Sequence, residues 1–178
     1  MLVTATVQAQ SVHITAEYPE YFEYGSGVLI DKAGGKSLVL SCGHIFRGGR
    51  DVKLTVNRAP ARLIGYELTD TSDLSLIVVD YDLDGTPVKI GPAPRAGDQV
   101  SVYGYGSRGQ NFRRATGVIK SDTRWVTGGV RHGDSGAAVA SGMSLVGIVS
   151  TTNDTATSMT RSGEISQFVS HYCQKPFG

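Results

Sequence analysis

Three short segments of the chain carry a histidine, an aspartate and a serine in surroundings that suit nucleophilic catalysis. His44 ends the apolar segment LVLSCGH, Asp73 begins the segment DLSLI, and Ser135 lies in the glycine-flanked loop RHGDSG at residues 131–136. A serine hydroxyl is a weak nucleophile at neutral pH and needs a neighbouring base to take its proton. Imidazole can accept and return that proton, and a carboxylate can hold the ring in the required tautomer. The segments therefore predict that Ser135 attacks a carbonyl, His44 is the base and Asp73 orients His44.

The loop around Ser135 also contains groups that could stabilise the transition state of this reaction. Gly133 lets the backbone turn its N–H groups inward, and Gly136 leaves room for a substrate backbone. We expect the N–H groups of Gly133 and Ser135 to bind the developing oxyanion. One such donor is typically worth about 3–4 kcal/mol of transition-state stabilisation.

Other histidines and acids compete for these roles. Asp70 lies three residues before Asp73, but only Asp73 is followed by Leu-Ser-Leu-Ile. The other histidines are His13, His132 and His171. His132 is too close to Ser135 along the chain to serve easily as its base, and we expect it to line the substrate cleft.

The elements that position these residues are predicted to be short strands. Apolar or alternating runs recur along the chain, and turn formers such as the glycine pairs at 34–35, 48–49 and 128–129 separate them. This spacing is typical of an antiparallel barrel or sandwich. The predicted strands are Ser26–Ile30, Ser37–Ser41, Val52–Val56, Ala61–Leu68, Leu74–Val79, Val88–Ile90, Gln99–Tyr103, Thr116–Ile119, Gly136–Val139 and Ser144–Ser150.

The C-terminal segment has the periodicity of a helix. Ile165, Phe168, Val169 and Tyr172 recur at helical spacing, which predicts one helix over residues 163–174 with Ser162 as its cap. A segment rich in glycine and proline, residues 83–94, lies near the middle of the chain. It predicts a boundary between two lobes, residues 1–85 and 86–178.

Composition and charge exclude several classes of function. The chain has 178 residues, with 17 Lys and Arg against 16 Asp and Glu. A balanced charge provides no global field to attract nucleic acid or an anionic membrane. No stretch approaches the ~18 apolar residues that cross a bilayer. We therefore expect no nucleic-acid partner and no membrane partner. A monomer is expected, although the sequence does not give the oligomeric state.

Cysteine usage and the N-terminal residues bear on the location of the protein. Cys42 and Cys173 are too few for a disulfide scaffold, and the sequence leaves open whether they pair. Residues 1–14 have neither a basic leader nor a continuous apolar run, so no signal peptide is visible. The expected location is the cytoplasm of the source or its host, with a mature exported form as the alternative.

The three segments resemble those of the chymotrypsin-like (trypsin-like) serine proteases. In that family a small-residue motif precedes the histidine, an Asp-aliphatic-small-Leu motif carries the aspartate, and Gly-Asp-Ser-Gly carries the nucleophile. The resemblance extends from the segment GSGVLI at residues 25–30 to the C-terminal helix. It implies an all-β fold of two packed antiparallel barrels with His44 and Asp73 in the first, Ser135 in the second and the active site between them. The short spacings between the three residues resemble a compact bacterial or viral type, and no metal or organic cofactor is expected.

The resemblance also implies residues that bind substrate. Gly129 would lie at the base of the primary specificity pocket, where it places no charge, so small or apolar side chains are favoured over Lys or Arg. Thr152 would line the pocket wall. The segment GIVS at residues 147–150, which ends at Ser150, matches the edge strand that pairs with the substrate backbone. The substrate is then a peptide or a protein, and the candidates include the protein's own precursor.

Asp134 carries over from the same resemblance. In animal members its partner is a new N-terminus released by cleavage, and this chain has no such activation junction. The segment RATG at residues 114–117 resembles bacterial members in which an arginine meets this aspartate. We expect Arg114, or Arg113, to pair with Asp134 and to support the oxyanion loop.

Four alternatives to a freely acting endopeptidase stay open. Ser135, Asp154 and His171 follow the residue order of α/β-hydrolases, although that fold needs alternating strands and helices. Cys42 and His44 with His171 and Cys173 supply ligand types for zinc, but at unusual spacing. A protease domain could also cleave only its own precursor, or it could serve as a binding module with little turnover.

Overall fold

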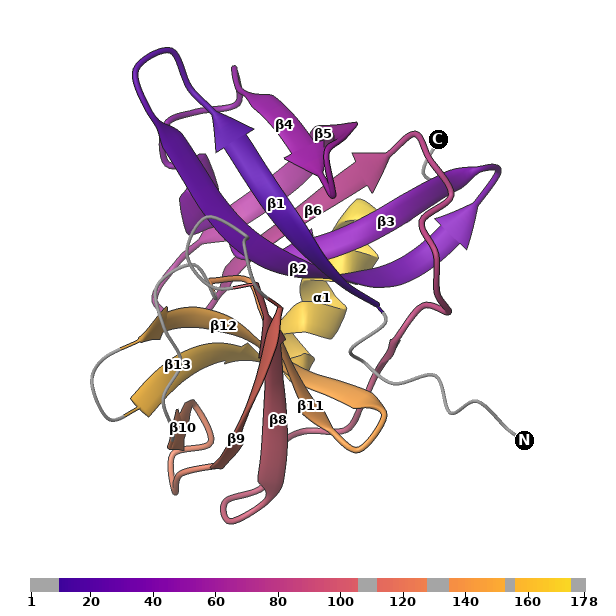
Figure 1. Cartoon of the computed structure of the whole chain (residues 1–178). Helices are drawn as coiled ribbons and strands as arrows, with labels where there is room; N and C mark the ends of the chain where they lie inside the picture. Colours follow the sequence, from indigo (N-terminus) through magenta and orange to yellow (C-terminus); the bar gives the residue numbers. More distant parts are fainter. Residues whose placement is uncertain (1–9, 106–111, 128–134, 153–155, 174–178) are drawn as a thin grey trace.

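The computed structural model describes residues 10–105, 112–127, 135–152 and 156–173 (Figure 1). Strands dominate, and a short 3-10 helix and one C-terminal α-helix complete the described chain. The elements are β1 (Ser11–Glu17), β2 (Phe22–Ala33), β3 (Lys36–Ser41), η2 (His44–Phe46), β4 (Lys53–Val56), β5 (Ala59–Leu68), β6 (Asp73–Val79), β7 (Lys89–Ile90), β8 (Gln99–Gly104), β9 (Arg113–Val118), β10 (Trp125–Thr127), β11 (Ala138–Ser141), β12 (Ser144–Thr152), β13 (Ala156–Arg161) and α1 (Ser162–Tyr172).

The first six strands form a closed antiparallel barrel in the order β1-β2-β3-β6-β5-β4. Strand β6 lies between β3 and β5, and all seven of its residues are buried. Side chains alternate between the two faces of a strand, so a continuous apolar run requires burial on both faces. In β6, Ile77 and Val79 fill the barrel interior, whereas Leu74 and Leu76 point to the other side. The barrel wall is therefore packed from inside and outside.

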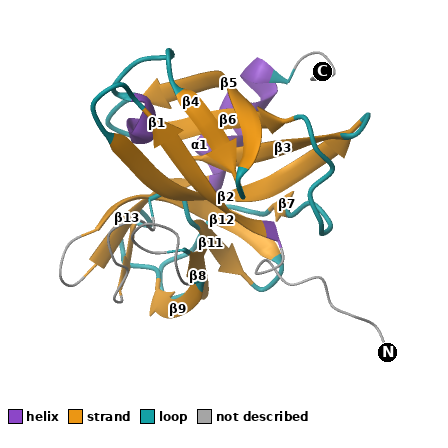
Figure 2. Ribbon diagram, turned by 45° about the horizontal axis from the view of Figure 1, so that its top comes forward, coloured by secondary structure: helices purple, strands orange, loops and turns teal. Residues whose placement is uncertain are grey.

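The remaining strands form a second antiparallel sheet in the order β10-β13-β12-β11-β8-β9, with β7 added in parallel to β12. An isolated bridge between Ile119 and Val126 joins the two ends of this sheet. Its interior is a separate cluster of mostly valine side chains that includes Val102, Val139 and Val149. The architecture is thus two antiparallel barrels, as the sequence predicts (Figures 1 and 2).

A third apolar cluster joins the two barrels. Leu40 and Leu76 of the first barrel meet Ala138 and Ile148 of the second, and Phe168 of α1 packs against the same cluster. The helix also reaches the first barrel, because the Tyr172 ring fills the space where a side chain at residue 65 would stand. The apolar face of this amphipathic helix therefore covers the junction of the two barrels.

Two local predictions need correction. Ser162 does not cap α1: the N-cap residue is Arg161, and the Ser162 hydroxyl donates to the carbonyl oxygen of Pro92 at 3.1 Å. Strands β1, β10 and β13 were absent from the sequence prediction. Strand β13 has no apolar alternation, and its buried residues include Thr157 and Thr160, so its pairing with β12 decides its conformation.

Among the described residues, no helix combines the length and the apolar character needed to span a membrane.

Candidate active site

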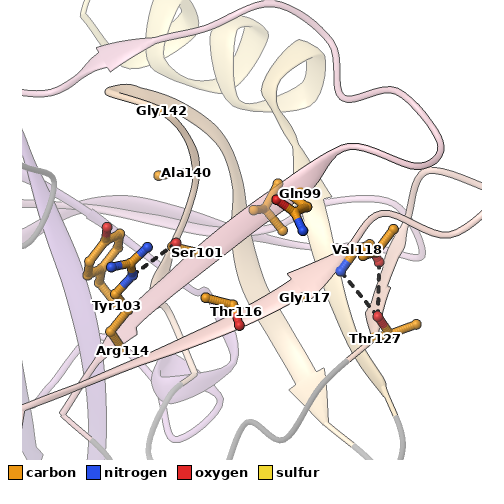
Figure 3. Close-up of a pocket in the computed structure, with 11 residues that line it drawn as sticks. Gln99, Ser101, Tyr103, Arg114, Thr116, Gly117, Val118, Thr127, Ala140 and Gly142 are labelled. Atoms are coloured by element: carbon orange, nitrogen blue, oxygen red, sulfur yellow. Dashed lines mark hydrogen bonds between the residues drawn. The ribbon is translucent and has the colours of Figure 1, made fainter.

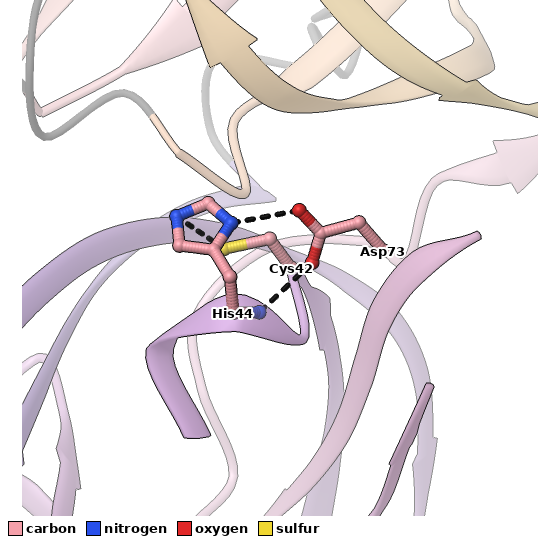
Figure 4. A group of neighbouring side chains, drawn as sticks. All are labelled: Cys42, His44 and Asp73. Atoms are coloured by element: carbon pink, nitrogen blue, oxygen red, sulfur yellow. Dashed lines mark hydrogen bonds and ion pairs between the residues drawn. The ribbon is translucent and has the colours of Figure 1, made fainter. Parts of the chain in front are cut away.

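Asp73 begins strand β6 and accepts hydrogen bonds on both carboxylate oxygens. Its Oδ1 accepts the backbone N–H groups of Gly43 at 2.7 Å and His44 at 2.8 Å. Its Oδ2 accepts His44 Nδ1–H at 2.7 Å and the Ser150 hydroxyl at 2.6 Å. Four donors therefore hold one carboxylate in a single orientation (Figure 4 shows those from His44).

The Asp73 backbone is also held, by a residue of the second barrel. Its N–H donates to Thr160 Oγ1 at 3.0 Å, and Thr160 belongs to β13 of the second barrel. Ser150 also belongs to the second barrel, on β12. The carboxylate consequently depends on both barrels for its position, although it belongs to the first.

His44 begins the 3-10 helix that follows β3, so a short connection places its ring over Asp73. The turn requires glycine at residue 43, because a Cβ there would collide with the carbonyl oxygen of Glu67 and lie 2.8 Å from that of Leu74. The imidazole is 18% exposed and the Asp73 side chain 8%. One ring nitrogen therefore faces a buried carboxylate, while part of the ring remains accessible.

The backbone after Ser135 is bonded to both barrels. The Ser135 carbonyl accepts the Ser26 N–H of β2 at 2.8 Å, and the Gly136 N–H donates to Val149 of β12 at 2.9 Å. Gly136 has φ +85°, and a Cβ there would collide with the Ser26 carbonyl and with Ser41 Oγ. Only glycine suits both the backbone angle and the space. This packing places Ser135 beside the segment that leads to His44.

Opposing influences set the pKa values of His44 and Asp73. Burial alone would lower the pKa of His44, but the hydrogen bond to Asp73, the contact with Cys42 and the Asp73 charge raise it above its usual value. Burial would raise the pKa of Asp73, but the hydrogen bond and charge of His44, together with the Ser150 hydroxyl, lower it. Asp73 is therefore a carboxylate at neutral pH, which keeps the His44 proton on Nδ1.

Cys42 is an unexpected neighbour of the imidazole. Its sulfur lies 3.9 Å from His44 Nε2, and its side chain is fully buried (Figure 4). The donor atoms of Cys42, His44 and Asp73 all lie within 4.8 Å of one another, and this is the one group of at least three metal-ligand side chains in the described part of the chain. His171 and Cys173 do not join it, so the four-ligand zinc site considered from the sequence is not assembled. Both cysteines are free thiols.

The edge-strand prediction for residues 147–150 is wrong for its first three residues. Gly147 and Ile148 pair with β11 on one side and β13 on the other, and Val149 bonds to Ala137 as well as pairing with Met159. Among the described residues, the part of β12 beyond Val149 contacts β13 alone, through Thr151 and Thr152. Backbone groups that could meet a substrate therefore begin at Ser150, whose side chain is bonded to Asp73.

Arg114 lies on β9, where its Nε–H donates to Ser101 Oγ at 3.1 Å and its guanidinium lies 5.8 Å from the centre of the Tyr103 ring. These residues line a groove of about 600 Å³ along β8 and β9 (Figure 3). Its lining includes neither His44 nor Asp73. The expected partner of Arg114, Asp134, lies outside the described residues.

Several other predicted site residues also lie outside the described part of the chain. They are Gly129, His132, Gly133 and, for the α/β-hydrolase alternative, Asp154. Thr152 ends β12, and its side chain is not described. The double-barrel fold excludes the α/β-hydrolase alternative, because that fold needs helices between its strands.

Two residues that contribute to the site were not predicted from the sequence but are evident in the geometry. Thr160 supports the Asp73 backbone, and Ser26 contacts the Ser135 carbonyl. Ser26 lies in the segment GSGVLI, which is part of the family resemblance. The sequence therefore pointed to this segment but not to the contact of Ser26 with Ser135. Thr160 lies in a polar segment with no distinctive pattern.

Solved structures with a similar fold include proteases. The Rv3671c protease from M. tuberculosis in its active form has a TM-score of 0.76 at 18% identity, covering 97% of this chain and 85% of that chain. Its inactive form has a TM-score of 0.71 at 19% identity, covering 94% and 90%. The serine endoprotease from Yersinia pestis has a TM-score of 0.75 at 16% identity, with 97% of this chain spanning 65% of that chain. At these identities the likeness shows the fold.

Sequence comparison supplies the family. No curated protein matches the chain by sequence. The model of the trypsin-like peptidase domain matches residues 25–167, which include His44, Asp73 and Ser135. The chain therefore belongs to the trypsin-like peptidase family, and it is a serine-type endopeptidase of the chymotrypsin fold.

Proposed function

We propose that the protein hydrolyses peptide bonds through a triad of Ser135, His44 and Asp73 and an acyl-enzyme intermediate. The observation that carries the proposal is the hydrogen bond of 2.7 Å between His44 Nδ1 and a carboxylate that three further donors hold in place. With its proton held on Nδ1, the neutral form of the ring has an unprotonated Nε2 that can act as a base.

Ser135 and His44 then account for the bond changes and proton transfers of each step of the reaction. Ser135 Oγ attacks the peptide carbonyl while His44 Nε2 takes the hydroxyl proton. His44 returns this proton to the leaving amine as the C–N bond breaks, which leaves Ser135 acylated. A water molecule attacks the acyl group, His44 takes the water proton and passes it to Ser135 Oγ, and the acid product leaves.

The remaining roles rest on the family resemblance. We assign the oxyanion site to the N–H groups of Gly133 and Ser135. We assign substrate binding to Gly129, His132, Ser150 and Thr152, and support of the loop to Asp134 with Arg114. We place the lobe boundary at residues 85–86, with the C-terminal helix in the second lobe. The natural substrate is a peptide or protein, with the precursor of this protein among the candidates.

Labelling with a fluorophosphonate tests the proposal. This reagent phosphonylates a serine that a neighbouring base activates, so we expect one label on Ser135 and none in His44→Ala. Mass spectrometry of proteolytic fragments locates the label. A folded wild-type protein that stays unlabelled would contradict the proposal and favour a binding module. Mass analysis of the native termini separates cleavage of the precursor from cleavage of other proteins.

The pH dependence of hydrolysis should reflect the environment of His44. Only the neutral ring can take the Ser135 proton, so activity falls as the pH drops through the pKa of His44 in the folded protein. Because that pKa is raised, we expect the acid limb of kcat/KM to have its midpoint above 6.5. The measurement is kcat/KM between about pH 5 and pH 10 on one peptide substrate. A midpoint at or below 6.5 contradicts the prediction.

A further inference from the structure

Asp73 lies on strand β6 beyond the point where one neighbouring strand ends. Strand β5 pairs with β6 as far as Leu68 opposite Asp73, whereas β3 pairs with β6 only as far as Ser41 opposite Ser75. Beyond Ser41 the chain leads into η2, and the Gly43 N–H bonds to the Asp73 carboxylate. At Asp73, therefore, the first barrel provides a paired strand on one side only.

The hydroxyl of Thr160, from the second barrel, bonds to the Asp73 backbone. Its Oγ1 accepts the Asp73 N–H at 3.0 Å and donates, at the longer distance of 3.5 Å, to the Asp73 carbonyl oxygen. Thr160 is 2% exposed and Asp73 is 6% exposed. Because both residues are buried, loss of this hydroxyl would leave a buried N–H without its acceptor.

The register of β13 explains why Thr160 faces the junction of the barrels. Thr160 lies opposite Ile148 of β12, and opposite residues of antiparallel strands share one face of the sheet. Ile148 belongs to the apolar cluster between the barrels, whereas Met159 belongs to the interior of the second barrel. Thr157 shares the face of Met159 and lies opposite Val126 of the same interior cluster. The two buried threonines of β13 therefore point to opposite sides of the sheet.

The hydrogen bonds of Asp73 connect it to two different parts of the molecule. Three donors on its carboxylate belong to the segment that carries His44. The Ser150 and Thr160 hydroxyls instead connect Asp73 to the second barrel, whose strand β11 follows Ser135. Ser150 and the His44 ring bond to the same carboxylate oxygen. Both bonds can persist only while the Asp73 backbone keeps its position between the two barrels.

We propose that Thr160 is a positioning residue for hydrolysis, whose hydroxyl fixes the Asp73 backbone so that the carboxylate holds His44 and bonds to Ser150 at the same time. The inference rests on the proposed function, because it assigns Thr160 to the reaction of the same site. It makes the rate of bond cleavage depend on a hydroxyl that belongs to none of the three reacting groups.

Two pairs of proteins that differ by this hydroxyl test the inference. Thr160→Val replaces the hydroxyl of the wild type by a methyl group, and Thr160→Ala lacks the hydroxyl that Thr160→Ser retains. Within each pair we expect kcat to be about ten- to hundredfold lower without the hydroxyl, with KM within about twofold. Thr160→Ser should keep kcat within about threefold of the wild type. If Thr160→Val does not fold, the Ala and Ser pair still decides.

Thr157→Val is the matched control for the loss of a buried hydroxyl. It removes the same group from the same strand, and no described residue forms a hydrogen bond with Thr157 Oγ1, so kcat should stay unchanged.

The double variant with Asp73→Asn separates positioning from a general loss of stability. If Thr160 acts through the carboxylate, adding Thr160→Val to Asp73→Asn should lower kcat by less than about threefold, because the positioned group is already absent. A merely structural role would lower kcat by the same factor in both backgrounds.

The NMR resonance of the His44 Nδ1 proton reports the bond to Asp73 whether or not the protein cleaves peptides. We expect this resonance to shift in Thr160→Val and Thr160→Ala, and to keep its position in Thr160→Ser and Thr157→Val.

The outcomes distinguish this inference from the proposed function. Cleavage by the wild type with equal kcat within each pair, or with the same loss in the Asp73→Asn background, overturns the role of Thr160 and leaves the proposed function standing. A folded wild type that cleaves no peptide overturns the proposed function. In that case a shifted resonance still supports Thr160 as the residue that positions Asp73 against His44, and an unchanged resonance overturns this role as well.

Discussion

Replacing Ser135 by alanine is expected to lower peptide hydrolysis by about 10⁴–10⁶-fold while the protein stays folded. The loss is large because no acyl-enzyme can form without the hydroxyl. The fold is retained because the contacts described at this position are made by the backbone. The Ser135 carbonyl accepts the Ser26 N–H, the Gly136 N–H donates to Val149, and alanine keeps both bonds.

The measurement is kcat/KM on a peptide that the wild type cleaves, with circular dichroism and the thermal midpoint as checks on folding. Ser166→Ala is the matched control, because it removes the same hydroxyl from an exposed position on α1 and should leave the rate unchanged. Loss of less than about tenfold in Ser135→Ala would move the nucleophile to another residue.

Replacing Asp73 by asparagine should lower kcat by about 10⁴-fold. Asparagine has only one acceptor oxygen, and the backbone N–H groups of Gly43 and His44 already occupy one oxygen of Asp73. If that oxygen is retained, the amide N–H₂ faces His44 Nδ1. Nδ1 must then act as an acceptor, which moves the ring proton to Nε2 and removes the base.

Asp70→Asn is the matched control for this variant. Asp70 is exposed and lies three residues earlier, so its substitution should leave kcat unchanged. The removed charge has a second consequence, because Asp73 contributes to the raised pKa of His44. The acid limb of any residual activity should therefore shift to lower pH in Asp73→Asn. Equal losses in the two variants, or a larger loss in Asp70→Asn, would contradict the assignment.

Four of the five strands predicted for the first barrel agree with the observed bounds to within two residues, for a physical reason, whereas β2 is longer than predicted and β1 was not predicted. Leu38, Val39 and Leu40 form a continuous apolar run because one face of β3 lines the barrel and the other packs against the junction. Such a run is visible in a sequence. Strand β13 could not be recognised in this way. Thr157 and Thr160 are buried because neighbouring elements cover them, and their own segment has no apolar pattern.

The candidate site also has features that the sequence predicts and features that only the structure reveals. The order of His44, Asp73 and Ser135, and the glycines next to His44 and Ser135, could be recognised in the sequence. Local conformation and reactivity restrict the residue types that these positions can hold. The Ser150 hydroxyl on Asp73 joins residues 77 positions apart, and Thr160 reaches Asp73 across 87. Contacts between residues so far apart along the chain produce no periodic pattern in the sequence, so only the packing of the two barrels reveals them.

By itself, the sequence determined the class of chemistry and a fold of short antiparallel strands, because turn glycines, apolar runs and reactive residues act over short stretches of chain. The arrangement of these strands in two barrels was implied only by the family resemblance. Only the tertiary structure decided which side chains hold the carboxylate and that Cys42 lies against the imidazole. These features arise where the end of β3, β6, β12 and β13 meet. Residues on different strands become neighbours only when burial of the three apolar clusters brings the strands together.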